Sequence, residues 1–499
     1  MEKLFEEFKS YRSKIDKYAE AVELLTWDMQ TGAPKDSIEH KIDAIGFFST
    51  EIFRLTTADE YGNMLEELIK PENFEKLDEG MKLTVKRETK DFERFKRVPE
   101  DFYEEYTKTT ARSEQAWEDA KEANDFSVFE PHLDKVIRMT KEYVKYMEPD
   151  QDPYEVLLDM YEEGMDSASI DKIFNELKEG LIPLLEEIKA KPAPDLSVMQ
   201  GVYSRASEKE AQDFLLDYIG FNFNCGATGE SMHPFTTTLC PGDVRITNSF
   251  DETNPVDAMF SAIHEGGHAI FEQNIDKKYE GTEAAVVNMM GLHESQSRFF
   301  ENILGRNINF WKPVYEKLGR IMPQLSRVPI ETFEKAINYV KADYIRTQAD
   351  EVTYCMHIIL RYEMEKAIFR DNVPTAELPA LWMKKSEELL GVIPPDDGKG
   401  ILQDMHWSDG SFGYFPSYLL GSVYDGMFLE AMEKDLGSVD AVLAEGRIKD
   451  ITKWLNEKIH RYGSLYNSKE VLQRVCGKEV TAEPLLRYFR EKYSRIYNL

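Results

Sequence analysis

The sequence predicts a mainly α-helical protein with one small antiparallel β-sheet near residues 220–250. Apolar residues recur at helical spacing along most of the chain, and 42% hydrophobic with 31% charged residues is the composition of a folded globular protein. Between Gly220 and Phe250, however, Thr, Asn, Gly, Pro and Cys replace Glu and Lys. We therefore expect one domain over residues 1–499, with an N-terminal helical part to about residue 218 and a second part from about residue 219.

The N-terminal part reads as a series of helices up to about Asp217. Turn signals interrupt it at Gly32-Ala33-Pro34 and at Pro192-Ala193-Pro194. Charged residues three and four apart between Phe74 and Trp117 are typical of solvated helix faces, and we assign no chemistry to them.

The second part begins with the predicted sheet, in which the segments 236–239 and 244–247 suit short strands bounded by turns. Helices resume at Asn254 and continue almost to Leu499, apart from a loop-rich stretch from Gly391 to Phe415. The simplest architecture is one helical body, or two lobes around a cleft.

The charge balance and the cysteines narrow the class of protein. With 61 basic and 92 acidic residues the net charge is −31, which argues against nucleic acid or an anionic membrane as a partner. No apolar run approaches the roughly 20 residues of a membrane helix, and the first residues do not resemble a secretion signal. The four cysteines are widely scattered, as expected of free thiols in a reducing compartment, so we expect a cytoplasmic protein.

The sharpest motif is His264-Glu265-Gly266-Gly267-His268. Asn254 and Pro255 are good N-cap and first-turn residues, and the apolar spacing after them predicts a buried helix that carries this motif. Two histidines one turn apart can bind one metal ion, and a catalytic zinc keeps an open position for a water whose pKa it lowers. Glu265 is then the candidate general base. A pair of core histidines beside tightly packed glycines is the alternative.

A catalytic zinc site needs a third protein ligand, and Glu294 is the candidate. A helix starting at Thr282 and ending at Gly305 would present it to the first helix. His293 points about 100° away from Glu294 on such a helix, so we favour Glu294 over it. A surface salt bridge from Glu294 to Arg298 is the competing interpretation.

Six motifs in order resemble those of the carboxypeptidase Taq family of metallocarboxypeptidases: HPF, DxRxT, HExxH, HESQ, IRxxAD and GxxQDxHW. In this sequence they are His233 to Phe235, Asp243 to Thr247, His264 to His268, His293 to Gln296, Ile345 to Asp350 and Gly400 to Trp407. The resemblance implies a helical fold with a deep active-site groove, one zinc ion per chain with cobalt as an alternative, peptide substrates with a free C-terminus, and a homodimer.

Cleavage of a C-terminal residue requires a cation for the substrate carboxylate, and an Arg fork binds a carboxylate with two hydrogen bonds. Arg346 is the first candidate and Arg245 the second. We place Arg346 on a long helix from Ile330 to Arg370, where an ion pair with Asp343 or Asp350 would be its structural role. The family resemblance favours the substrate role.

The remaining candidates serve the reacting carbonyl and the peptide backbone. Related oligopeptidases use a His and a Tyr to hold the tetrahedral oxyanion, which His406 and Tyr418 match, with Tyr414 as a rival for Tyr418. His233 falls in the predicted sheet, whose edge strand could bind substrate backbone. Structural support of the groove is an equally good interpretation of this segment.

We therefore expect a metal-dependent carboxypeptidase of broad specificity, in which His264, His268 and Glu294 hold the metal. An oligoendopeptidase with the same site is the enzymatic alternative. A helical binding scaffold without catalysis is the alternative from another class, and it is disfavoured because structural zinc sites have four protein ligands.

Overall fold

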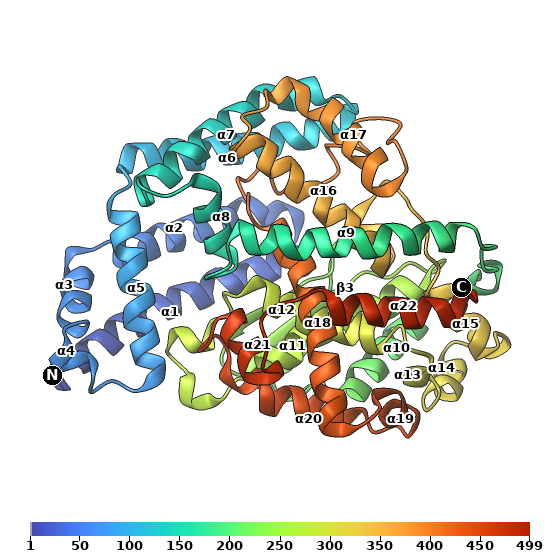
Figure 1. The fold of residues 1–499 in the computed structure, drawn as a ribbon. Coiled ribbons are helices and arrows are strands. Elements are labelled where there is room, and N and C mark those ends of the chain that lie inside the picture. Colours follow the sequence, from blue (N-terminus) through green and yellow to red (C-terminus); the bar gives the residue numbers. More distant parts are fainter. Residues whose placement is uncertain (1) are drawn as a thin grey trace.

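The computed structural model describes residues 2–499, and helices account for most of them (Figure 1). The N-terminal helices are α1 (Glu2–Thr31), α2 (Ile38–Thr56), α3 (Asp59–Leu68), α4 (Pro71–Phe74) and α5 (Glu79–Lys96). They are followed by α6 (Glu100–Ala123), α7 (Phe126–Met147), α8 (Pro153–Tyr161), α9 (Ser167–Lys189) and α10 (Arg205–Ile219). The helices predicted up to about Asp217 and both predicted interruptions are therefore confirmed.

The second part begins with the strands β1 (Gly226–Glu230), β2 (Thr236–Cys240) and β3 (Asp243–Asn248). Next come α11 (Pro255–Gln273), α12 (Met290–Arg298), the π-helix η5 (Phe299–Leu304), α13 (Ile308–Trp311), α14 (Tyr315–Ile321), α15 (Ile330–Ile337), the 3₁₀ turn η7 (Arg346–Gln348) and α16 (Glu351–Phe369). The last helices are α17 (Leu378–Leu390), α18 (Phe415–Leu436), α19 (Val439–Ala444), α20 (Ile448–Lys458), α21 (Ser468–Cys476) and α22 (Glu483–Tyr497).

The sheet is mixed, so the prediction of an antiparallel sheet is wrong in one pairing. The strand order is β1-β3-β2, with β2 antiparallel to β3 but β1 parallel to it. β1 has the sequence GATGE, in which Thr228 is the only residue of a type that marks strands. Its glycines are needed for packing, because a Cβ at Gly226 would lie 2.8 Å from the Val244 carbonyl oxygen and one at Gly229 would lie 2.8 Å from the Trp27 ring.

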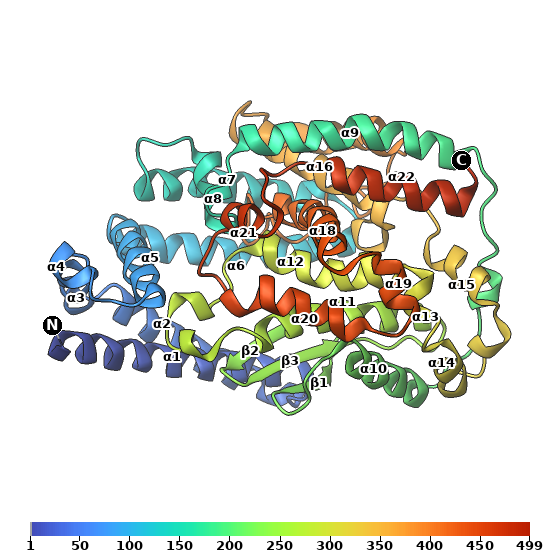
Figure 2. The same ribbon diagram turned by 60° about the horizontal axis from the view of Figure 1, so that its bottom comes forward.

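The helices enclose a large apolar core, and a smaller apolar cluster joins α1, α3 and α5 at one end of the molecule (Figure 1). In the second view α11 and α12 lie side by side in the middle of the body, with β1 to β3 below them (Figure 2). No helix within residues 2–499 combines the length and the apolar character needed to cross a bilayer. All four cysteines are free thiols.

Candidate metal centre

Helix α11 places two imidazoles side by side. It begins at Pro255 after Asn254, as predicted, although the Asn254 side chain makes no capping hydrogen bond. His264 and His268 have ring centroids 5.0 Å apart. Their Nε2 atoms face the same carboxylate oxygen, Glu294 Oε2, at 3.9 Å and 3.6 Å. The structure thus brings the three predicted ligands together.

The spacing of these three side chains fits one divalent metal ion. One ligand atom from each residue lies within 4.8 Å of the other two. Ligand atoms at about 2.1 Å from a tetrahedral zinc ion lie about 3.4 Å from each other, close to the separations found here. Two nitrogens and one carboxylate oxygen are also a common catalytic zinc set, so both geometry and donor chemistry fit.

Two glycines in the motif determine how closely the neighbouring elements approach α11. A Cβ at Gly267 would lie 2.7 Å from both the Gln296 oxygen and the Ser297 Cα, so this glycine lets the backbone of α12 pack directly against α11. At Gly266 a Cβ would meet only the side-chain ends of Ile219 and Leu216, at 2.7 Å and 2.8 Å. Gly267 therefore sets the distance between Glu294 and the two histidines.

The substitution Gly267→Ala is expected to weaken metal binding about 10-fold, because its methyl group would push α12, and Glu294 with it, away from α11. Gly266→Ala is the matched control: it adds the same methyl one residue earlier, against side chains that can move. Competition with a metal chelator measures both dissociation constants. Equal affinities in the two variants would show that the contact at Gly267 does not control the ligand spacing.

The helix that carries Glu294 differs from the prediction at its start. Thr282 precedes only a 3₁₀ turn, η4 (Glu283–Ala285), and α12 begins at Met290. Its end is as predicted, because the π-helix η5 continues α12 as far as Gly305. This π-helix carries Glu301, whose Oε2 accepts a hydrogen bond of 2.8 Å from Nδ1 of His264. The bond fixes the ring with Nε2 directed to the metal position.

The carboxylates around His264 attract a cation. Burial disfavours the charged ring, but Glu301, Glu294 and Glu265 outweigh it and raise the pKa of His264 to about 9. For His268 burial dominates, together with the two neighbouring histidines, and it keeps the pKa well below the usual value. Burial also opposes ionisation of Glu301, yet His264 and two arginines hold its pKa near 2. A metal ion bound here would therefore replace the proton that these carboxylates favour on His264.

The two competing interpretations of the third ligand can now be judged. His293 donates from Nε2 to Glu272 at 2.9 Å and stacks on His268, so its Nε2 is already bonded. Glu294 does form the predicted contact with Arg298, at 3.5 Å, but through Oε1, while Oε2 faces the histidines. One carboxylate thus makes both contacts.

Glu265 is a buried carboxylate that the sheet holds in place. Thr236, the first residue of β2, donates from its hydroxyl to Glu265 Oε2 at 2.6 Å. Burial raises the pKa of Glu265, although His264 and the Thr236 bond act in the opposite direction. A carboxylate with a raised pKa accepts a proton from water more readily than an exposed one does.

Arg346 lies in the 3₁₀ turn η7, not on a helix running from Ile330 to Arg370. That predicted helix is wrong: α15 ends at Ile337 and α16 begins at Glu351, where Asp350 caps it by accepting from two backbone N–H groups. The Arg346 side chain donates to Asp404 at 2.8 Å and to the Tyr354 hydroxyl at 3.2 Å, whereas neither Asp343 nor Asp350 pairs with it.

The predicted His406, Tyr414 and Tyr418 lie close together, next to Arg346. His406 Nε2 and the Tyr418 hydroxyl are 3.0 Å apart, and the Arg346 guanidinium lies 5.2 Å from the Tyr418 ring centroid. Tyr414 packs against Tyr418 with a centroid distance of 4.9 Å. Burial and Tyr414 raise the pKa of Tyr418 well above its usual value, and burial lowers that of His406 to about 4. Both groups are therefore neutral near pH 7.

Two predicted substrate residues lie in the sheet region without a contact to the metal ligands. Arg245 pairs with Asp243 at 2.7 Å and lies over the Trp27 ring. His233 is exposed in the loop between β1 and β2, so its predicted position within the sheet is wrong. Its Pro neighbour and the short connection from β1 keep it outside the ladder.

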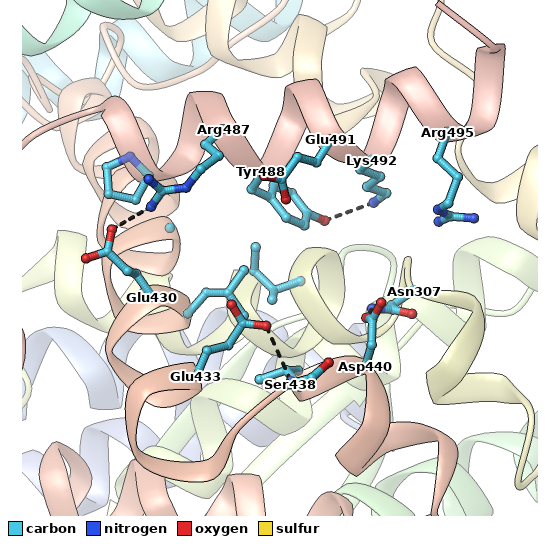
Figure 3. Close-up of a pocket in the computed structure, with 15 residues that line it drawn as sticks. Asn307, Glu430, Glu433, Ser438, Asp440, Arg487, Tyr488, Glu491, Lys492 and Arg495 are labelled. Atoms are coloured by element: carbon cyan, nitrogen blue, oxygen red, sulfur yellow. Dashed lines mark hydrogen bonds and ion pairs between the residues drawn. The ribbon is translucent and has the colours of Figure 1, made fainter.

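A cavity of about 330 Å³ opens elsewhere, between η5, α18, α19 and α22 (Figure 3). Several of its charges are already paired, such as Arg487 with Glu430 and Lys492 with Glu351. None of its lining residues is a predicted site residue.

Sequence reasoning missed two residues that contact the site, Thr236 and Glu301. Glu301 follows Glu294 by seven residues, and positions seven apart lie about 20° from each other around a helix, which is a usable signal. Thr236 had none, because its contact with Glu265 depends on how β2 packs against α11.

Comparison of the chain with known proteins identifies its family. Residues 7–493 match the family model described as carboxypeptidase Taq (M32) metallopeptidase. Carboxypeptidase 1 of Bacillus subtilis is 41% identical over 99% of this chain and 98% of its own length, and thermostable carboxypeptidase 1 of Pyrococcus furiosus is 35% identical over 95% of each.

A solved structure has the same fold over the same length. The M32 carboxypeptidase from Deinococcus radiodurans superposes with a TM-score of 0.95 at 30% identity, covering 100% of both chains. The match thus extends from the N-terminal helices through the metal centre to the last helix. The chain belongs to the carboxypeptidase Taq (M32) metallopeptidase family and is a metallocarboxypeptidase, a hydrolase of peptides.

Proposed function

We propose that the chain removes single residues from the C-terminus of peptides, with Glu265 as general base, His406 and Tyr418 as oxyanion stabilisers and Arg346 as the anchor of the substrate carboxylate. The observation that carries the proposal is the arrangement of His264, His268 and Glu294 around one point, beside a buried Glu265. A bound divalent metal supplies Lewis acidity there, which polarises the scissile carbonyl and acidifies a water molecule.

Glu265 takes a proton from the attacking water, whose oxygen bonds to the carbonyl carbon. When the C–N bond breaks, Glu265 gives that proton to the leaving nitrogen. If His406 carries its proton on Nε2, it donates to the Tyr418 oxygen and leaves the Tyr418 proton free to bond the oxyanion. The raised pKa of Tyr418 keeps this proton in place.

Arg346 is suited to hold the terminal carboxylate. Asp404 and Tyr354 fix Nε and Nη1, while Nη2 bonds no other described residue. The side chain is 10% exposed, so a carboxylate bound to it is largely shielded from water. A shielded ion pair with a directed N–H donor contributes more than an exposed one.

Peptides that differ only in a C-terminal carboxylate or amide test this anchor. We expect the amide to lower kcat/KM about 100-fold in the natural protein, because one charged hydrogen-bonded contact is lost. In Arg346→Gln the acid and the amide are expected to react at the same low rate. Arg245→Gln is the matched control, in which the preference for the acid should persist.

An amide hydrolysed as fast as the acid would instead favour the oligoendopeptidase. A preference that disappears in Arg245→Gln but survives in Arg346→Gln would move the anchor to the sheet.

We also propose zinc as the ion, with cobalt as the substitute. Two imidazoles and one carboxylate suit these borderline metals, whereas magnesium prefers an all-oxygen shell. Elemental analysis of the purified protein tests this choice.

The family resemblance supports a homodimer that acts on peptides of varied sequence. The four free thiols support a cytoplasmic location. The chain mass is 57.9 kDa, and light scattering should give about twice this value for the dimer.

A further inference from the structure

Helix α16 holds the loop 404–414 at two places that are one helical turn apart. Arg361 donates from Nε to Asp404 at the start of the loop, at 2.7 Å. Glu365 accepts from the Trp407 indole N–H at 3.0 Å and from the Gly413 backbone N–H at 3.0 Å. The loop itself has no α-helix or strand, so these contacts replace a regular backbone hydrogen-bond pattern.

Glu365 is fully buried, which makes its charge costly unless every lone pair is used. Besides the two loop donors it accepts a third hydrogen bond, of 2.9 Å, from the hydroxyl of Tyr154 on α8. Trp407 bonds one oxygen of the carboxylate, whereas Gly413 and Tyr154 share the other. Two of the three donors thus belong to the loop and one to the scaffold.

The loop donors stand directly beside the candidate catalytic groups. Trp407 follows His406, and Gly413 precedes Tyr414. Gly413 has a φ of +88°, and a Cβ there would lie 2.7 Å from the carbonyl carbon and oxygen of Leu157. A shift of Trp407 or Gly413 would therefore also shift His406 or Tyr414, to which each is joined by one peptide bond.

We propose that Glu365 is a positioning residue for peptide hydrolysis: by binding Trp407 and Gly413 it holds the loop so that His406 stays in contact with Tyr418. The inference rests on the proposed roles of His406 and Tyr418. Glu365 touches no reacting atom, and its effect is to keep His406 and Tyr418 in the geometry that the transition state requires.

The variant Glu365→Gln tests the inference with little change in volume. The amide NH₂ of Gln would face either the Trp407 indole N–H or the donors that now bond the other oxygen, Gly413 N–H and the Tyr154 hydroxyl. In either case two hydrogen-bond donors face each other and a contact with the loop is lost. We expect kcat to fall about 30-fold, with KM and metal content unchanged. Affinity for a phosphinic peptide, which mimics the tetrahedral state, should fall by the same factor.

Tyr154→Phe is the matched control because it removes the third hydrogen bond to the same carboxylate without altering the loop. Its kcat should stay within about 3-fold of the natural protein, even if the melting temperature falls. Trp407→Phe, which keeps a ring but loses the donor, should resemble Glu365→Gln. It also decides the question if Glu365→Gln does not fold.

The inference is overturned if folded Glu365→Gln keeps the kcat of the natural protein, or if Trp407→Phe does so where Glu365→Gln does not fold. It is also overturned if Tyr154→Phe loses as much kcat as these variants, because the carboxylate would then serve stability alone. Tyr418→Phe, measured alongside, separates this result from a failure of the proposed function. Full activity in Tyr418→Phe would refute the proposed oxyanion role and the inference that rests on it. A large loss in Tyr418→Phe with none in Glu365→Gln would refute the inference alone.

Discussion

Replacing Glu265 by Gln is expected to lower kcat about 1000-fold while the metal content stays unchanged. Gln has the same shape and can accept the Thr236 hydrogen bond, but it cannot take a proton from water. His264, His268 and Glu294 are untouched, so the ion should bind as before. Steady-state kinetics and elemental analysis of the same sample measure the two quantities.

Thr236→Val provides a graded comparison for this variant. It leaves the Glu265 carboxylate in place but removes the 2.6 Å bond that orients it, so a loss of about 10-fold is expected. Activity of Glu265→Gln within a factor of ten of the natural protein would exclude Glu265 as the base.

The second large effect is expected for Glu294→Gln, which should weaken metal binding about 1000-fold. The amide oxygen is a neutral and poorer ligand for a divalent ion. The change also removes the carboxylate whose Oε1 lies 3.5 Å from the buried Arg298 guanidinium, so this cation loses its ion-pair partner beside the metal position. Titration against a chelator of known affinity measures the dissociation constant.

Glu301→Gln is the control for this second prediction. It removes a carboxylate that contacts His264 but not the metal position, and a 10- to 100-fold effect is about what such outer partners contribute. If Glu294→Gln binds the metal no worse than Glu301→Gln does, Glu294 is not the third ligand. Weaker metal binding in His293→Ala would then identify His293 as the third ligand.

Local patterns predicted the parts of the site that lie on single elements. The spacing of His264 and His268 on a buried helix requires only helical geometry and an N-terminus near Asn254. The helical breaks at Gly32 and near Pro192 follow from the same local chemistry.

Features that depend on distant contacts were not predictable in this way. The break between α15 and α16 arises because Asp350 caps a new helix and Asp404, 58 residues beyond Arg346, binds that arginine. In β1, Gly226 faces the Val244 carbonyl oxygen of β3 and Gly229 faces the Trp27 ring of α1, and both of these contacts are distant in the chain. Neither partner can be read from a window of neighbouring residues.

The backbone contact at Gly267 also has an evolutionary consequence. Because the backbones of α11 and α12 are in direct contact, the distance from Glu294 to the two histidines depends on backbone packing and not on the sizes of the surrounding apolar side chains. Core residues can therefore drift between homologues without retuning the coordination geometry, provided that this one position never acquires a side chain.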